Sequence, residues 1–275
     1  MTIARILRLA DGARTETDFG NGRPIPAVAT RRGEWTDFAA SPGVDQSLEP
    51  WGALERNGRL RGTARLTIER DEWRVRSELR SATARSVAQV RKSFREVSHI
   101  LAGDHEKRQP ESAVDDTVWS AWAAGIAAAG WKMSARADRR FVVDLDLRAG
   151  FWQATGEPCG PRLRLSVPIG KARLSVPECR LAVGRYLLAA TDAVRLVRAT
   201  HAPSRGLNLE ATLPAGSTRS DSDDALNALG LAAQHVGREV DALSDAGFAR
   251  KYLDLTLTKE RQCEWMIARE FSCSK

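Results

Sequence analysis

Hydrophobic and polar residues alternate with a period of two in several stretches of this 275-residue chain and with a helical period in others. Between residues 64 and 80, apolar positions alternate with charged ones on both sides of the turn Arg70-Asp71-Glu72, which predicts a β-hairpin. From residue 82 to 101, apolar residues recur every three or four positions. This spacing predicts an amphipathic helix that packs on the apolar face of the hairpin.

The second half of the chain predicts a longer series of elements with the same two periods. Near the end of the chain, Leu253, Leu255 and Leu257 alternate with other residues, which predicts a last strand that could pair with residues 264–269. In chain order, the elements before that strand are a helix capped by Asp115 and Asp116 and ending at Gly130, three strands between Phe141 and Ile169, a helix from Pro177 to about Ala199, a strand from Leu207 to Leu213, and a helix from Ser222 to Leu243.

The start of the chain and the middle of the chain have fewer regular patterns. Residues 3–9 predict a short strand, whereas residues 10–60 contain so many turn formers that we expect no long regular element there. The stretch Gly103 to Ser112 is polar and contains a proline, as linkers do. We therefore divide the chain into an N-terminal unit at 1–103, a linker at 104–112 and a C-terminal unit at 113–275.

The two units have similar patterns. The hairpin and helix of Arg61 to Leu101 correspond to the strands and helix of Arg140 to Ala199, and the sequence ARLTI at 64–68 is similar to ARLSV at 172–176. The predicted fold class is therefore α+β, with antiparallel sheets, packed helices and two related units.

The order of elements from Asp115 to Leu243 resembles the type III secretion chaperone-like fold. The order of that family is one helix, three strands, a second helix, two strands and a third helix, and one of the last two strands is not evident in this chain. Members of the family are non-enzymatic, usually dimeric proteins that hold extended segments of a partner. The resemblance therefore implies a protein-binding module.

The net charge of +7 is concentrated in one region, because residues 56–95 hold twelve basic and four acidic residues. Alternation along the hairpin projects four arginines from one face, with three more basic residues nearby on the helix. About six to ten contacts between such residues and phosphates would give strong, salt-sensitive binding to nucleic acid. A solvated face, or one docked on an acidic partner, explains the same pattern. The candidate binding residues are Arg65, Arg74, Arg76, Arg80, Arg85, Lys92 and Arg95.

No catalytic or metal-binding motif is present in the sequence. The four cysteines lack CxxC spacing, and no phosphate-binding loop or nucleophile motif occurs. Asp144 and Asp146 share a strand face and could hold a metal ion, and Asp221, Asp223 and Asp224 could do so before a helix. Solvated strand charges and helix capping explain both sets without a metal. We therefore expect no metal and no cofactor, although an enzyme with an unfamiliar site stays possible.

No apolar stretch in the sequence is long enough for a membrane span, and we expect a cytoplasmic protein with reduced cysteines and no membrane partner. The expected function is that of a chaperone or assembly adaptor that holds a protein partner. The alternative is a sequence-tolerant nucleic-acid binder that uses the arginine-rich hairpin face. A homodimer is compatible with either function.

Overall fold

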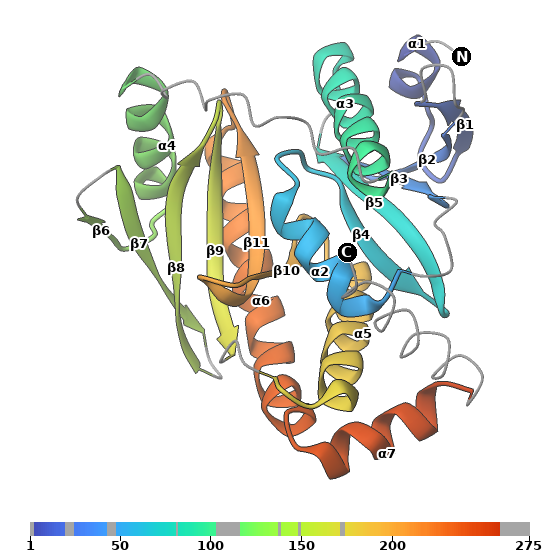
Figure 1. Cartoon of the computed structure of the whole chain (residues 1–275). Coiled ribbons are helices and arrows are strands. Elements are labelled where there is room, and N and C mark those ends of the chain that lie inside the picture. Colours follow the sequence, from blue (N-terminus) through green and yellow to red (C-terminus); the bar gives the residue numbers. More distant parts are fainter. Residues whose placement is uncertain are drawn as a thin grey trace.

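The computed structural model describes residues 3–19, 25–42, 48–80, 82–102, 116–136, 139–147, 150–170 and 174–258. These residues form an α+β fold with two antiparallel sheets (Figure 1). None of the described helices is long and apolar enough to cross a membrane. We call the part from α1 to α3 the N-terminal unit and the part from α4 to α7 the C-terminal unit.

The N-terminal unit consists of a five-stranded sheet, sheet A, and three helices. Its strands lie in the order β1-β2-β3-β5-β4, and every neighbouring pair is antiparallel. The elements are α1 (Ile3–Leu7), β1 (Arg14–Asp18), β2 (Pro26–Arg32), β3 (Trp35–Ala40), α2 (Pro50–Arg59), β4 (Arg65–Glu69), β5 (Glu72–Arg80) and α3 (Ala84–Leu101).

The C-terminal unit repeats this order and adds one strand and one helix. Its sheet, sheet B, has the order β10-β11-β9-β8-β7-β6, so β7-β8-β9-β11-β10 matches β1-β2-β3-β5-β4. The elements are α4 (Asp116–Ala128), β6 (Met133–Arg136), β7 (Arg140–Leu147), β8 (Gly150–Cys159), β9 (Arg162–Gly170), α5 (Pro177–Ala193), β10 (Arg198–Ala202), β11 (Gly206–Pro214), α6 (Arg219–Leu243) and α7 (Ala246–Thr256).

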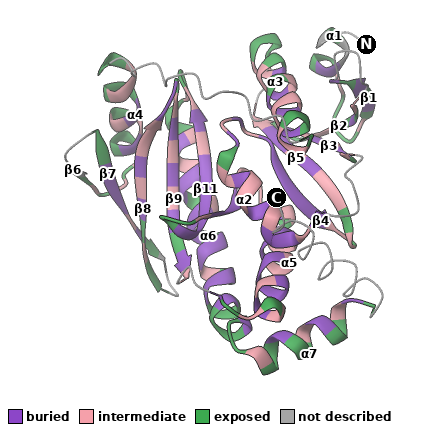
Figure 2. Ribbon diagram, viewed as in Figure 1, coloured by how far each residue is buried: buried purple, intermediate pink, exposed green. Residues whose placement is uncertain are grey.

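One face of each sheet is covered by the last long helix of the shared order. In α3, the buried residues Val87, Val90 and Phe94 follow a helical spacing, and the Phe94 ring lies 5.1 Å from that of Phe19. In α6, buried residues recur at a helical spacing from Ser222 to Leu243 and lie against sheet B, behind the strands in Figure 1. Burial alternates along strands such as β1 and β9, whereas β4, β10 and β11 are buried on both faces along most of their length (Figure 2).

The two units meet at the centre of the molecule, where α2 packs on β10 and α5 packs on β4. The crossing of α2 and β10 is close, since a Cβ on Gly58 would lie 3.0 Å from the carbonyl oxygen of His201. The amide of Asn57, which is fully buried, donates to the carbonyl oxygens of Leu66 at 3.0 Å and Ala199 at 3.1 Å. One side chain of α2 thus joins the edge strands of both sheets.

Several expectations for the first 60 residues are wrong. Residues 3–7 form helix α1 rather than a strand, and the stretch from 10 to 60 holds β1, β2, β3 and α2. Its many turn formers occur between short elements, so that Gly33, for example, turns β2 into β3 with a positive φ of 59°. Dense turn signals therefore mark short hairpins here rather than irregular chain.

The repeat is present, but its register differs from the expected one. Leu174 and Ser175, within the expected ARLSV match, precede α5 and form no strand. The strands that occupy equivalent places are β4 and β10, which begin Arg-Leu-Thr and Arg-Ala-Thr respectively. The sequence did not predict β10, because a helix was expected from Pro177 to about Ala199. In the structure, this helix ends at Ala193 and β10 begins at Arg198.

The end of the chain also differs from expectation. Leu253 and Leu255 lie in helix α7, not in a strand, and α7 begins with an Asp245 side chain that accepts hydrogen bonds from two backbone N–H groups at 2.9 and 3.1 Å. The strand expected at 264–269 and the linker expected at 104–112 lie outside the described residues. The hairpin of 64–80 and the helix that follows it are confirmed.

Candidate functional site

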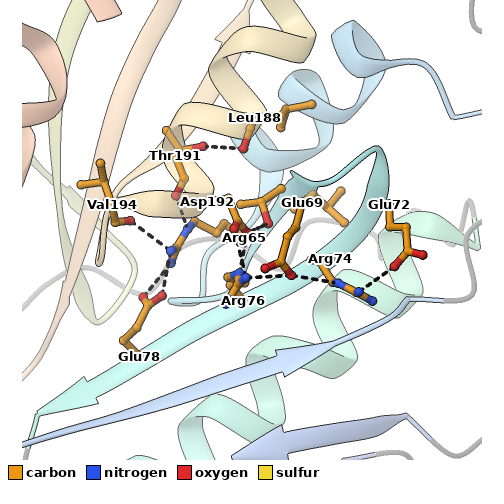
Figure 3. Close-up of polar contacts among 12 residues, drawn as sticks. Arg65, Glu69, Glu72, Arg74, Arg76, Glu78, Leu188, Thr191, Asp192 and Val194 are labelled. Carbon is orange, nitrogen blue, oxygen red and sulfur yellow. Dashed lines mark hydrogen bonds and ion pairs between the residues drawn. The ribbon is translucent and has the colours of Figure 1, made fainter. Parts of the chain in front are cut away.

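The charged face of the β4–β5 hairpin, which was expected to face solvent, lies against the C-terminal unit. Arg65 is only 1% exposed. Its guanidinium donates two hydrogen bonds to the carboxylate of Glu78, at 2.6 and 2.7 Å (Figure 3). It also donates to the carbonyl oxygens of Thr191 at 3.3 Å and Val194 at 3.1 Å. The prediction that Arg65 belongs to an exposed binding face is therefore wrong.

Two more arginines of the same face form ion pairs across the two units. Arg76 contacts Asp192 at the end of α5, with an Nη2–Oδ2 distance of 3.0 Å. Burial lowers the pKa of Arg76, but the hydrogen bond and charge of Asp192 outweigh it, so that the pKa is raised. Arg80 lies 2.6 Å from a carboxylate oxygen of Asp224 in α6. These carboxylates neutralise charge that would otherwise be available to phosphates.

The remaining four candidate residues are divided between paired and open positions. Arg74 lies 2.6 Å from a carboxylate oxygen of Glu72. On α3, Arg95 donates from Nε to a backbone carbonyl oxygen at 3.0 Å. Arg85 and Lys92 are exposed, and no carboxylate of the described residues forms an ion pair with either. Because α3 lies on the other face of sheet A, Arg85 and Lys92 do not extend the face of the hairpin arginines. Two open cations are also fewer than the roughly six to ten phosphate contacts of a strong nucleic-acid interface.

The C-terminal unit has a buried ion pair of its own at the same junction. Arg198, at the start of β10, lies 3.2 Å from a carboxylate oxygen of Glu210 and donates to the carbonyl oxygen of Gly62 at 2.9 Å. A cavity of about 10 Å³, room for about one water molecule, lies between this pair and Glu78. Arg65 of the N-terminal unit therefore donates to backbone carbonyl oxygens of the C-terminal unit, and Arg198 of the C-terminal unit donates to one of the N-terminal unit. These buried contacts hold the two units together.

Four of the five aspartates weighed as metal ligands have protein partners, and the fifth, Asp146, is exposed on β7. Asp144 accepts a hydrogen bond from the amide of Gln153 at 3.1 Å. Asp221 forms a capping box with Thr218 at the start of α6, and Asp223 accepts from a tryptophan Nε1 at 2.9 Å. Among the residues that the structure describes, no group of three or more potential ligands could hold a metal ion.

Sheet B exposes an aromatic side chain on the face opposite α6. In β8, Ala154 is fully buried and Trp152 packs on the core, so odd-numbered residues such as Phe151 and Gln153 project from the other face. Phe151 is 61% exposed. Its position is one of the largest apolar exposures on the described surface.

The residues around Phe151 are mostly polar or acidic. Asp146 of β7 lies opposite Phe151 in the register, and Asp144 lies opposite Gln153. Pro168 of β9 projects from the same face and is exposed. We call these five residues the open face of sheet B. An exposed aromatic ring beside two carboxylates is suited to a partner that offers an apolar side chain and a nearby cation.

The sequence contains a signal for this surface that is weaker than the arginine cluster. Phe151 begins a strand in which apolar and polar residues alternate, and it falls in phase with Gln153 rather than with the buried Ala154. An aromatic residue in the polar phase of a half-buried strand indicates an exposed ring. The arginine cluster was the stronger sequence signal, although Arg65, Arg76 and Arg80 form ion pairs within the protein.

Comparison with known proteins finds no match for this chain. No family model matches it, and neither the curated proteins nor the solved structures include a match. An account of function therefore depends on the geometry of the described residues.

Proposed function

We propose that the protein is a non-enzymatic protein-binding module, a chaperone or assembly adaptor that holds an extended segment of a partner. The observation that carries the proposal is Phe151, whose ring is 61% exposed on the open face of sheet B. Aromatic residues are enriched in the cores of protein interfaces, where they bury a large area at a small cost in side-chain entropy. A helix-free sheet surface gives an extended chain a path along which alternate side chains contact the protein.

The order of elements supports the same function. Both units contain one helix, three strands, a second helix, two strands and a third helix, and the C-terminal unit has β6 and α7 in addition. This is the order of the type III secretion chaperone-like fold, whose members hold extended partner segments. Members of that family are usually dimers. A chain with two fused units would therefore contain, in one molecule, the two folded units that such a dimer contains.

The charge of the open face of sheet B indicates the kind of segment that fits. Asp144 and Asp146 lie along β7 next to Phe151, and Lys132, whose carbonyl oxygen accepts a hydrogen bond from the Asp144 N–H group at 3.1 Å, lies on the side of Asp144 away from β8. The expected segment therefore carries an apolar anchor for Phe151 and a lysine or arginine two residues away, since alternate residues of an extended chain share a side. Complementary charge would mainly affect the rate of association and the register.

The test is a tagged pulldown from the native host, divided into nuclease-treated and untreated halves. Phe151→Asp should abolish recovery of a stoichiometric, nuclease-resistant protein partner, because it places a third carboxylate at the anchor position. Leu231→Asp is the matched control, since Leu231 is 53% exposed on α6, on the opposite side of sheet B, and should leave recovery unchanged.

Other results would contradict the proposal. Equal recovery by the Phe151→Asp and wild-type proteins would exclude the open face of sheet B as the binding site. Recovery of nucleic acid without a stable protein partner would favour the alternative function. Wild-type binding should then fall steeply with salt, and Arg85→Glu with Lys92→Glu should weaken it and reduce its dependence on salt.

A further inference from the structure

The two sheets differ at their outer edges. In sheet B, β7 is followed by β6, which pairs with it from Met133↔Val143 to Arg136↔Arg140. The equivalent strand of sheet A is β1, and among the described strands only β2 pairs with it. Among the described residues, the position that carries a further strand in sheet B is therefore unoccupied in sheet A. Unpaired strand edges attract another strand because their backbone groups lack partners.

The hydrogen bonds to β2 show which backbone groups of β1 lie at this edge. Phe19 N–H donates to the Ile25 carbonyl oxygen, and Arg31 N–H donates to that of Ala13, each at 3.1 Å. Hydrogen-bonded pairs alternate along an antiparallel ladder, so the odd-numbered residues of β1 bond to β2. The N–H and C=O groups of Arg14 and Glu16 consequently point away from β2, toward the edge.

The side chains of β1 alternate between buried and exposed. Thr15 and Thr17 are buried on the side covered by α3, whereas Arg14 and Glu16 are exposed on the other face. Arg14 and Glu16 carry opposite charges two residues apart, and no ion pair within the described residues neutralises either one. A strand added antiparallel would therefore need an acidic residue opposite Arg14 and a basic residue opposite Glu16.

The strand β1 itself meets this requirement. We infer that a second copy of the chain pairs with this edge, β1 against β1, in an antiparallel arrangement with its twofold axis at Thr15. Arg14 of each copy then lies opposite Glu16 of the other, which forms two equivalent charge pairs. Thr15 lies opposite Thr15, and threonine pairs across strands are favourable. The shared edge is isologous, as a closed symmetric dimer requires.

The backbone is compatible with this register, and charge distinguishes it from its neighbours. Arg14 and Glu16 both direct their N–H and C=O groups to the edge, so opposing them produces hydrogen-bonded pairs, and Thr15 occupies the closer, non-hydrogen-bonded position between them. A shift of two residues in either direction places Arg14 opposite Arg14 or Glu16 opposite Glu16 at the axis. Like charges directly opposite are destabilising. The two five-stranded sheets would then form one continuous sheet of ten strands.

A single pair of five-residue strands buries little surface, so the dimer should form reversibly and depend on protein concentration. Charge reversal tests it by sedimentation equilibrium. Arg14→Glu alone and Glu16→Arg alone each place like charges in both pairs and should weaken the dimer by roughly tenfold or more. Mixing the two variants restores opposite charges and should give a heterodimer as stable as the wild-type dimer.

A backbone control separates the pairing of strands from a general effect of charge. Glu16→Pro removes an N–H group that points to the edge and leaves the bonds between β1 and β2 in place, so it should abolish the dimer without unfolding the protein. Circular dichroism of each variant checks the fold. A wild-type protein that stays monomeric at all concentrations, or a variant mixture that does not associate, would overturn the inference. A monomer that loses a pulldown partner through Glu16→Pro would assign the edge to another protein and also overturn it.

Discussion

Replacing Glu78 with glutamine should destabilise the protein strongly, because it leaves the charge of Arg65 buried without a counter-charge. The carboxylate accepts two hydrogen bonds from Arg65 at 2.6 and 2.7 Å and one from the Leu196 N–H group at 3.2 Å. The two side chains are 1% and 6% exposed, so bulk solvent cannot screen the charge that is left on Arg65. Breaking a buried ion pair on one side costs about 3–5 kcal/mol, a large part of the 5–15 kcal/mol, in round terms, of a typical domain.

Urea unfolding followed by circular dichroism and tryptophan fluorescence measures this loss. Glu72→Gln is the matched control, since Glu72 pairs with Arg74 at 2.6 Å but is 65% exposed. The control should change the free energy of unfolding by less than about 1 kcal/mol. Similar effects for Glu78→Gln and Glu72→Gln would refute the argument that burial makes the Arg65–Glu78 pair important.

Three further predictions concern the packing and the ionisation of the described residues. Leu253→Ala should lower the free energy of unfolding by about 2–5 kcal/mol, because Leu253 is buried in α7. Leu255→Ala, at a 76% exposed position of the same helix, should change it by about 0.5 kcal/mol or less. Equal losses in thermal unfolding would favour a strand, in which both side chains share a face. Gly156→Ala should cost about 1–3 kcal/mol, because its Cβ would lie 2.2 Å from a phenylalanine ring, while Gly125→Ala in α4 should be neutral or stabilising in urea unfolding. Burial raises the pKa of Tyr186 to about 12 and also raises that of the other tyrosine, so the folded state loses stability only as pH rises above about 10; absorbance at alkaline pH should show most of both phenols still protonated at pH 10.

Local periodicity was sufficient to predict an element where the element packs on its neighbour in the chain. The hairpin of residues 65–80 and helix α3 are present as expected, because strand alternation and helical spacing reflect contacts between residues that lie close in sequence. The capping of α6 by Asp221 is also local, since the carboxylate contacts Thr218 three residues away. Such features require no knowledge of the tertiary structure.

The ends of elements were less predictable when they depended on distant partners. The sequence from Pro177 to Ala199 is compatible with one helix, yet α5 ends at Ala193 and Leu196 adopts a positive φ of 66°. This break lets residues 198–202 pair with β11 and lets Val194 accept a hydrogen bond from Arg65. The helix ends there because long-range pairing and the junction between units stabilise the alternative conformation.

The sequence by itself determined the α+β class, the hairpin and helix of the N-terminal unit, and the existence of a repeated pattern. Only the tertiary structure decided which faces are open. Alternation shows that Arg76 and Arg80 share a face of the hairpin, but their carboxylate partners Asp192 and Asp224 lie 116 and 144 residues away. A strand pattern defines two faces and leaves open what covers each of them, because that depends on segments brought together by folding.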